Sequence, residues 1–218
     1  MTAGSEGHTL VLEASTYAGS VALLRGVDVV AERDVEMRGR DEERLMPAVA
    51  ECVARMPDGL AGVRRLVCGA GPGSFTSLRI AASIAKGICH ARGIPLFAVS
   101  SLALIVAGSD QSLSGGRFMA SLDAMRGEAF AALFEATPDD IVAVGPVRIV
   151  ATAGLANEAR IAGGVMLAGA PHARHAARML DAVVRAGPVD LGSWEPDYGR
   201  SAEAQVKWEA AHGRPLPR

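Results

Sequence analysis

The segment 68–90 constrains the fold of this chain more than any other. A short apolar run ends at Cys68, three glycines and one proline follow within residues 69–73, and a helical pattern begins directly afterwards. An apolar run, a glycine-rich turn and helical spacing in this order predict a strand, a tight turn and a helix. We expect Gly71 and Gly73 to adopt backbone angles that other residues resist.

The helix expected over residues 76–91 is apolar around most of its circumference. A side-chain oxygen of Ser74 or Thr76 is expected to cap its first free amides. At about 100° per residue, a narrow polar stripe runs between two flanks of small or apolar residues. The stripe consists of Arg79, Ser83, Lys86 and His90, and the flanks consist of Ile80, Ile84 and Ile88 on one side and Leu78, Ala82, Ala85 and Cys89 on the other. Such a helix should be covered on more than one side, by its own sheet and by another chain.

Three strands are expected before that segment. Three β-rich runs lie between Thr9 and Glu36, with turn residues between them, and this pattern indicates a meander. The first run is almost entirely apolar and should be central, whereas the third alternates and should lie toward an edge. The element order of this part, βββαβα, is the half-unit of the ribonuclease-H-like fold shared by sugar kinases, actin and Hsp70, which is a topological analogy.

An amphipathic helix is expected over Asp41–Met56. Its apolar positions recur at helical spacing, and they are Leu45, Val49, Cys52, Val53 and Met56. Because a proline inside a helix removes a hydrogen bond and clashes one turn back, Pro47 indicates either a regular helix that begins near Met46 or a kink. Strands are expected at Val63–Cys68 and Leu96–Val99.

The second half of the chain shows looser patterns. Residues 100–107 predict a helix capped by serine, and residues 108–116 a polar, flexible loop. The later expectations are a hairpin of Arg117–Asp123 and Glu128–Glu135, β-structure over Ile141–Val150, a strand at Val165–Ala168, a helix at Ala173–Arg185, and a tail with a short helix capped by Ser201. We expect a first lobe over residues 1–99 and a second, looser lobe over residues 100–218.

Composition is typical of a globular protein. The chain has 218 residues, a net charge of −2 and 50% hydrophobic residues, with no dense basic tract to favour direct nucleic-acid binding. The first residues lack the features of a secretory signal, and no apolar run approaches the ~20 residues that span a bilayer. Cys52, Cys68 and Cys89 have no metal or redox spacing, so we expect buried thiols in a cytoplasmic protein.

Candidate phosphate sites are weak. The turn at residues 71–74 has the glycines of a phosphate-binding turn, but it lacks the Lys-Ser/Thr ending of a Walker loop, and a structural turn needs the same glycines. We favour the structural turn. Ser15 and Thr16, after Glu13, lie where an actin-like kinase holds its phosphates, but polar residues are common at strand ends.

Metal and nucleophile motifs are also incomplete. His90, His172 and His175 are not joined by a carboxylate or cysteine at ligand spacing, and no serine lies in a Gly-x-Ser-x-Gly elbow. We therefore expect no catalytic residue, no metal site and no cofactor site in this chain alone.

Four segments together resemble one protein family. They are Leu-Glu-Ala-Ser-Thr (12–16), Glu-Arg-Leu-Met-Pro (43–47), Gly-Ala-Gly-Pro-Gly-Ser-Phe-Thr-Ser-Leu-Arg-Ile (69–80) and Leu-Asp-Ala-Met-Arg-Gly-Glu (122–128). The family is TsaB, also called YeaZ, the non-catalytic partner in bacterial threonylcarbamoyladenosine synthesis on tRNA. The resemblance runs from about Thr9 into the Pro196-Asp-Tyr-Gly-Arg tail. The chain departs from the family at Glu13, where Asp is usual, and at Glu42-Glu43, where His-Thr is usual.

The resemblance implies an α/β fold of two ribonuclease-H-like, actin-like ATPase (ASKHA) lobes with mixed sheets flanked by helices. It implies pairing with the catalytic subunit TsaD, which joins threonylcarbamoyl-adenylate to the adenosine next to the anticodon, and completion by the ATPase TsaE. The chain would then meet tRNA only through the complex, with no membrane contact, and a nucleotide is possible at the subunit junction. The departure at Glu13 puts a metal-phosphate role there in doubt, because the longer side chain displaces the carboxylate.

In the family, two helices of the first lobe dock on TsaD, and they match Asp41–Met56 and Thr76–Ala91 here. The residues expected to bind the partner are Leu45, Val49, Val53, Arg79, Ala82, Ser83 and Lys86. The same helices should form a homodimer when the partner is absent. The alternatives are a merely solvated polar stripe on the second helix and, for the whole chain, an autonomous actin-like ATPase or phosphotransferase.

Overall fold

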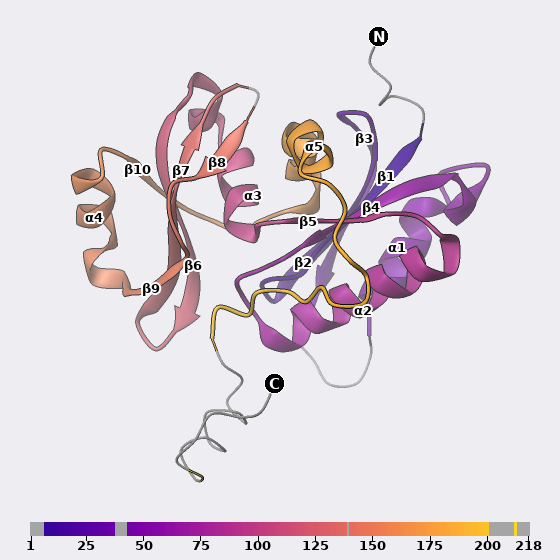
Figure 1. Ribbon diagram of the computed structural model, residues 1–218, viewed down its shortest axis with the longest axis horizontal. Coiled ribbons are helices and arrows are strands. Elements are labelled where there is room, and N and C mark those ends of the chain that lie inside the picture. Colours follow the sequence, from indigo (N-terminus) through magenta and orange to yellow (C-terminus); the bar gives the residue numbers. More distant parts are fainter. Residues whose placement is uncertain (1–6, 38–42, 139, 201–211, 213–218) are drawn as a thin grey trace.

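The computed structural model describes residues 7–37, 43–138, 140–200 and 212. Two five-stranded sheets lie side by side with helices between and around them (Figure 1). The first sheet has the order β3-β2-β1-β4-β5, and its strands are β1 (His8–Glu13), β2 (Ala18–Arg25), β3 (Asp28–Glu36), β4 (Val63–Gly69) and β5 (Leu96–Val99). Strands β1 to β3 form an antiparallel meander, and β4 and β5 run parallel to β1. The predicted meander, with a central first strand and an edge third strand, is confirmed.

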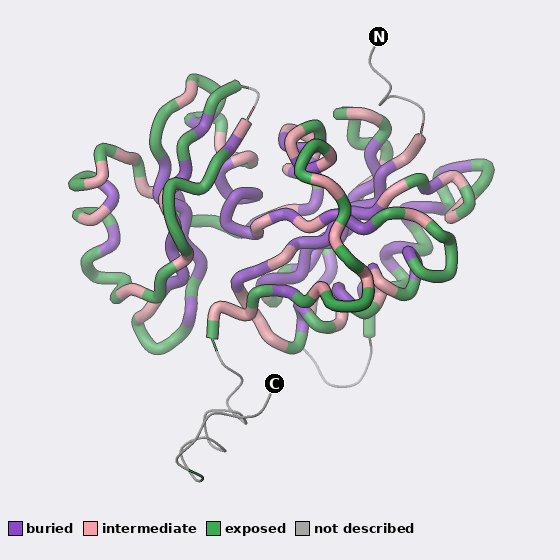
Figure 2. The backbone as a smooth tube through the Cα atoms, in the orientation of Figure 1, coloured by how far each residue is buried: buried purple, intermediate pink, exposed green. Residues whose placement is uncertain are grey.

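The two faces of the first sheet are covered by different helices. On β1, Leu10 and Leu12 pack with α1 (Leu45–Val53) and α2 (Phe75–Arg92), whereas Val11 points to the opposite face and a second cluster. This is the period-2 alternation of a strand buried on both faces. Figure 2 shows the strands at the centre of the buried region.

Helix α1 is shorter than the predicted span of 41–56. It begins at Leu45, which places Pro47 in the first turn, where a missing N–H breaks no intrahelical bond. The Glu43 carboxylate accepts hydrogen bonds from the amides of Leu45 and Met46. Residues 54–56 after the helix form a turn, and residues 43–44 before it are not helical, so the prediction was wrong at both ends. Residues 41–42 lie outside the described part.

The second sheet has the order β10-β6-β7-β8, with β9 also paired to β7. Its strands are β6 (Gly116–Met125), β7 (Glu128–Ala136), β8 (Ile141–Ala143), β9 (Arg148–Ala151) and β10 (Val165–Ala168). The predicted hairpin and the predicted last strand are confirmed. The outer face of this sheet packs on α4 (Leu155–Ile161), a helix that the sequence analysis missed.

Helices α3 (Ser101–Ala107) and α5 (Ala176–Arg185) fill the space between the two sheets. One cluster of buried side chains joins both helices to both sheets, for example Val67 of β4, Leu104 of α3 and Phe130 of β7. The predicted serine cap of α3 is confirmed, because the Ser100 side chain accepts a hydrogen bond from the Ala103 amide. The division at residues 99 and 100 stays a prediction.

The loop predicted between α3 and β6 contains a 3-10 turn, Asp110–Ser114, in which Ser112 is buried and the other residues are exposed. Ser112 is fully buried, and its hydroxyl donates to the Val106 carbonyl at 2.6 Å. Arg178 of α5 donates to the Ser112 hydroxyl and carbonyl. These contacts tie the turn to α5. The flexibility of the rest of this loop stays a prediction. Other 3-10 turns lie at Gly59–Gly62, Thr152–Gly154 and Ala173–His175.

After α5 the chain returns across the first sheet toward the second. We name residues 190–200 the C-terminal strap, which runs over α2 in Figure 1. The Asp197 amide donates to the Ala70 carbonyl at 2.8 Å, so the strap folds back on its own chain. The predicted tail helix capped by Ser201 lies outside the described residues. Within the described part, no helix has the length and apolar character needed to cross a membrane.

Candidate functional site

The carboxylate of Glu13 is buried at the end of β1. It is 0% exposed, and it accepts hydrogen bonds from the Ser15 amide at 2.6 Å and the Ser101 hydroxyl at 2.9 Å. Gly69 at the end of β4 leaves the space for it, since a Cβ there would overlap the carboxylate. Burial raises the pKa of Glu13, and its hydrogen bonds oppose this shift only in part. Glu13 therefore ties β1, β4 and α3 together.

The glycine turn before α2 packs against the β1–β2 turn. Gly71 and Gly73 have φ angles of +87° and +159°, as predicted. A Cβ on Gly73 would overlap the Ser15 carbonyl, which accepts from the Ser74 amide at 2.7 Å. The Gly71 amide donates to the Ser101 hydroxyl at 3.2 Å. Two amides of the turn are thus used within the chain, which favours the structural interpretation of its glycines.

The predicted side-chain cap of α2 is wrong. Ser74 occupies the N-cap position, but its side chain makes no capping hydrogen bond. Its hydroxyl lies 3.0 Å from the Ser77 hydroxyl instead. The helix begins at Phe75, so Thr76 is already inside the first turn.

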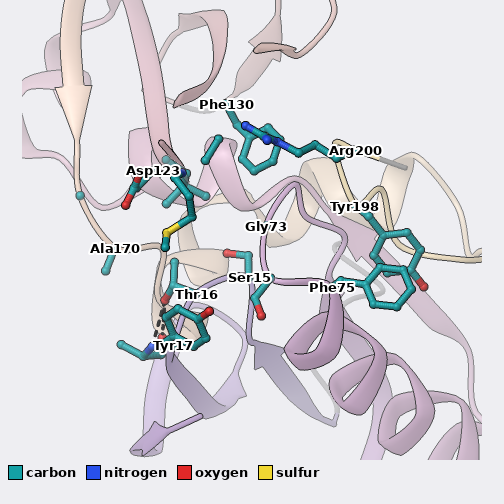
Figure 3. Close-up of a pocket in the computed structure, with 16 residues that line it drawn as sticks. Ser15, Thr16, Tyr17, Gly73, Phe75, Asp123, Phe130, Ala170, Tyr198 and Arg200 are labelled. Atoms are coloured by element: carbon teal, nitrogen blue, oxygen red, sulfur yellow. Dashed lines mark hydrogen bonds between the residues drawn. The ribbon is translucent and has the colours of Figure 1, made fainter. Parts of the chain in front are cut away.

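A cleft of about 780 Å³ opens between the ends of the two sheets (Figure 3). The β1–β2 turn, the glycine turn, the β6–β7 turn and the strap form its walls. Its lining is Ser15, Thr16, Tyr17, Ala18, Gly73, Ser74, Phe75, Leu122, Asp123, Ala124, Met125, Phe130, Gly169, Ala170, Tyr198 and Arg200. Most of these side chains are apolar or small, so the walls offer few groups to a charged ligand.

The polar groups of the cleft are largely paired within the chain. The Thr16 hydroxyl donates to the Ala18 carbonyl, and a carboxylate oxygen of Asp123 accepts from the Met125 amide at 2.8 Å. Arg200 forms an ion pair with Glu128. Met125 lies at φ +69°, an uncommon left-handed conformation for a residue with a side chain.

The predicted partner-binding residues separate into two groups. Four lie in the chain's own core, with exposed fractions of 0–8%: Leu45, Val49, Val53 and Ala82. Arg79 and Ser83 are exposed on α2, and Lys86 is half-buried on the same face. The structure thus brings only these three together at the surface, and the four buried residues support that surface from behind.

The outer face of α2 also carries a shallow groove of about 510 Å³. Its lining includes Arg79, Ser83 and the half-buried Ile80 and Ile84. Sequence reasoning placed these four residues on or beside one stripe. It missed the contact of Arg79 with Tyr198 of the strap, and no local pattern signals that contact, because 119 residues separate the two.

The thiols and imidazoles serve the fold. All three cysteines are free and buried, as predicted, and burial raises the pKa of Cys89 to about 11. His172 donates from Nε2 to Asp34 at 2.9 Å, because its Nδ1 accepts from the Arg174 amide. His175 donates from Nδ1 to the Leu104 carbonyl at 3.1 Å. Among the described residues, no three His, Cys, Asp or Glu side chains gather as metal ligands would.

Known proteins match this chain in sequence. The family model described as "TsaD: tRNA N6-adenosine threonylcarbamoyltransferase" matches residues 39–179. The chain is 31% identical over 126 residues to the "tRNA threonylcarbamoyladenosine biosynthesis protein TsaB" of Escherichia coli, covering 58% of this chain and 54% of that protein. The Bacillus subtilis protein of the same name gives the same identity and coverage. The chain thus spans about half the length of the curated relatives it matches.

A solved structure shows the same fold. YeaZ from Pseudomonas aeruginosa superposes with a TM-score of 0.72 at 23% identity, over 88% of this chain and 99% of that chain. The family model covers well over half of the 218 residues. Together with the curated relatives and the shared two-sheet fold, this match shows that the chain belongs to the TsaB/YeaZ family.

Proposed function

We propose that this chain is a non-catalytic subunit that docks on a TsaD-like catalytic subunit through the outer face of α2. The catalytic subunit would transfer the threonylcarbamoyl group to the adenosine next to the anticodon, and this chain would support it without touching tRNA. The names of the curated relatives support a place in that pathway.

The outer face of α2 is the observation that carries the proposal. Arg79 and Ser83 are exposed there, with Lys86 on the same face and the half-buried Ile80 and Ile84 along one flank. Half-buried aliphatic side chains bordered by charged ones are typical of an interface that is covered in a complex. The buried Leu45, Val49 and Val53 of α1 lie in one hydrophobic cluster with the inner side of α2.

The hydrogen bonds of the Glu13 carboxylate favour a non-catalytic role of this chain over phosphate transfer. A carboxylate that assists phosphate transfer through a metal must face the ligand. Here both oxygens of Glu13 are engaged by Ser15 and Ser101, away from the cleft. The cleft volume is the one observation that favours the alternative of an autonomous ATPase or phosphotransferase. Titration calorimetry with magnesium-ATP on the lone chain separates the two, since tight binding with turnover would favour the alternative.

Reconstitution tests the proposal directly. The TsaD-like subunit of the same genome, a TsaE-like ATPase, tRNA and threonylcarbamoyl-adenylate are combined with and without this chain, and modified adenosine is measured. We expect modification to depend on the chain. Equal modification without it would reject the proposal.

Two further elements belong to the proposal. Alone, the chain is expected to form a homodimer through the α2 face, because an exposed apolar surface finds a copy when its partner is absent. A single monomeric species at micromolar concentration in sedimentation velocity would count against this. A nucleotide, where the complex holds one, is expected at the junction of the subunits and not within this chain.

A further inference from the structure

Arg79 is held in a fixed orientation by two aromatic rings. Its guanidinium carbon lies 4.3 Å from the centre of the Phe75 ring and 5.7 Å from the centre of the Tyr198 ring. Its Nε donates a hydrogen bond to the Tyr198 hydroxyl at 3.3 Å. The two rings contact each other, with centres 4.5 Å apart and planes tilted by 47°. Stacking and the hydrogen bond together restrict the rotation of the side chain.

Tyr198 is itself fixed by the strap on both sides. The preceding Asp197 amide donates to the Ala70 carbonyl, and the Asp197 carboxylate accepts from the Gly199 amide, each at 2.8 Å. Gly199 has a φ of +67° and packs so tightly on Phe130 that a Cβ would overlap the ring. Arg200 then pairs with Glu128 of the second sheet. The ring that positions Arg79 is therefore anchored to both sheets.

The terminal nitrogens of Arg79 keep their hydrogen-bond capacity. A guanidinium has five N–H donors, and toward the residues that the structure describes only the Nε donor of Arg79 is used. Within the described part of the chain, Arg79 forms no ion pair, whereas Arg33, Arg148 and Arg174 each meet a glutamate. Lys86, in contrast, has an acidic neighbour, Asp190. Hydrogen bonds from Ser193 lower the pKa of Asp190, and the positive charge of Lys86 lowers it further.

The surroundings of Arg79 favour an acidic partner. Helix α2 contains no Asp or Glu between Phe75 and Arg92, so its outer face carries only positive charge. Among the described residues that line the groove, Glu43 is the one acid, and it accepts hydrogen bonds from the α1 amides of Leu45 and Met46. The groove therefore presents an oriented cation beside aliphatic side chains, and no carboxylate of the described residues forms an ion pair with that cation.

The geometry points to Arg79 as a pre-oriented binding site for a carboxylate, supplied by an Asp or Glu side chain of the docking subunit, with Tyr198 as the positioning residue. A carboxylate accepts two parallel N–H bonds from a guanidinium fork, which adds both energy and direction. Because the rings hold the fork before binding, less side-chain entropy is lost when the pair forms. This inference rests on the proposed function, since it names the chemistry by which that partner is recognised.

The test is titration calorimetry of the TsaD-like subunit against the full chain and its variants, without nucleotide. We expect Arg79→Ala to weaken binding by about 30-fold or more and Arg79→Lys by about tenfold, since a lysine cannot form the bidentate pair. Tyr198→Phe keeps the ring and removes the hydroxyl, and it should weaken binding about threefold. Arg92→Ala, at the end of the same helix, is the matched control and should stay within about twofold.

A double-mutant cycle separates positioning from a structural role. If Tyr198 acts through Arg79, Tyr198→Phe has no further effect on binding in the Arg79→Ala background. Equal losses in both backgrounds would overturn the positioning role, and wild-type affinity of Arg79→Lys would overturn the bidentate carboxylate. Thermal unfolding of each variant verifies that it is folded.

The outcomes for the two proposals are distinct. If the wild-type chain does not bind the subunit, the proposed function fails and this inference fails with it. If the wild-type chain binds and the Arg79 variants bind equally well, only the inference fails. If Arg79→Ala matters only when ATP is added, the anion is a phosphate and the carboxylate assignment is wrong.

Discussion

The cleft between the sheets and the outer face of α2 differ in two properties, the volume of the hollow and the polar groups left available to a ligand. The cleft is the larger hollow, about 780 Å³ against about 510 Å³ for the groove on α2. Several of its polar side chains, however, are paired inside the chain, as for Asp123 and Arg200, although the buried Ser15 hydroxyl has no partner among the described residues. The α2 face is shallow, yet it presents Arg79 with its terminal nitrogens free of ion pairs within the described residues. The comparison teaches that unpaired hydrogen-bond donors identify a candidate binding surface better than the volume of a hollow does.

The Glu13 carboxylate lies near the cleft but is engaged within the fold. The carboxylate stands at the end of the central strand, next to the turn that borders the cleft. It is turned inward, under Gly69 and toward Ser101. A buried carboxylate with two hydrogen bonds fixes the position of neighbouring elements. At this position the carboxylate thus joins β1, β4 and α3.

The largest expected effect is that of Gly69→Ala. The added methyl group would overlap the Glu13 carboxylate, so we expect a loss of at least about 3 kcal/mol of unfolding free energy, measured by denaturant titration. A near-neutral result would mean that Glu13 can turn into the cleft, which would remove the difference between the two regions.

Glu13→Ala should have a smaller effect. It leaves the buried Ser15 amide and Ser101 hydroxyl without their acceptor, and the expected loss is about 2 kcal/mol of unfolding free energy. Glu13→Gln retains an acceptor for the Ser15 amide and serves as the matched control, with a smaller loss at pH 7. Equal stability of the alanine variant and the wild type would show that the carboxylate holds no structure.

The pH dependence of stability gives a third comparison. Because the folded-state pKa of Glu13 is raised above its ordinary value of 4.5, the folded chain binds this proton more tightly than the unfolded chain. The resulting stability is fully present below pH 4.5 and is lost as the pH rises through the raised folded-state pKa. Glu13→Gln should lack this component, so the stability difference between the variant and the wild type should change in favour of the variant as the pH rises. A difference independent of pH would contradict the burial of an ionisable Glu13.

The smallest expected effect belongs to Gly87→Ala on the outer face of α2. No atom lies within 4 Å of the Cβ position at Gly87, and alanine is the better helix former, so the unfolding free energy should rise by about 0.5–1 kcal/mol. This contrasts in sign with Gly69→Ala. A destabilised Gly87→Ala variant would indicate that the α2 face is covered within the chain.

The sequence predicted the first sheet and its helices well because strong local signals mark them. Glycines, a proline and a short apolar run that ends at Cys68 marked the segment around α2. The helix ends at Gly93 in a left-handed conformation, which is common for glycine at a helix end. Helix α4 was missed because it has only 7 residues, no side-chain cap and two buried positions, Leu155 and Ala159. Such a helix depends on packing against the second sheet, which no local pattern reveals.

The candidate site was predicted only in part. Helical spacing identifies an apolar face, but it does not tell the chain's own core from a partner, and Leu45, Val49 and Val53 proved to be core. The exposed stripe was identified correctly at Arg79 and Ser83. The role proposed for Tyr198 depends on its contact with Arg79, which lies far away in the sequence. The cap prediction at Ser74 was wrong because the Ser74 amide is bonded to the Ser15 carbonyl, a contact that no local pattern reveals.

The most direct test compares the affinity of the TsaD-like subunit for two variants, one in each region. Charge reversal by Arg79→Glu and Lys86→Glu together should weaken binding at least about 100-fold, because the α2 face would then repel an acidic partner. Ala170→Trp, which places a ring in the cleft, should change the affinity by less than about twofold. Both variants should remain folded in thermal unfolding. Unchanged affinity after charge reversal, or a large loss with Ala170→Trp, would contradict docking through α2.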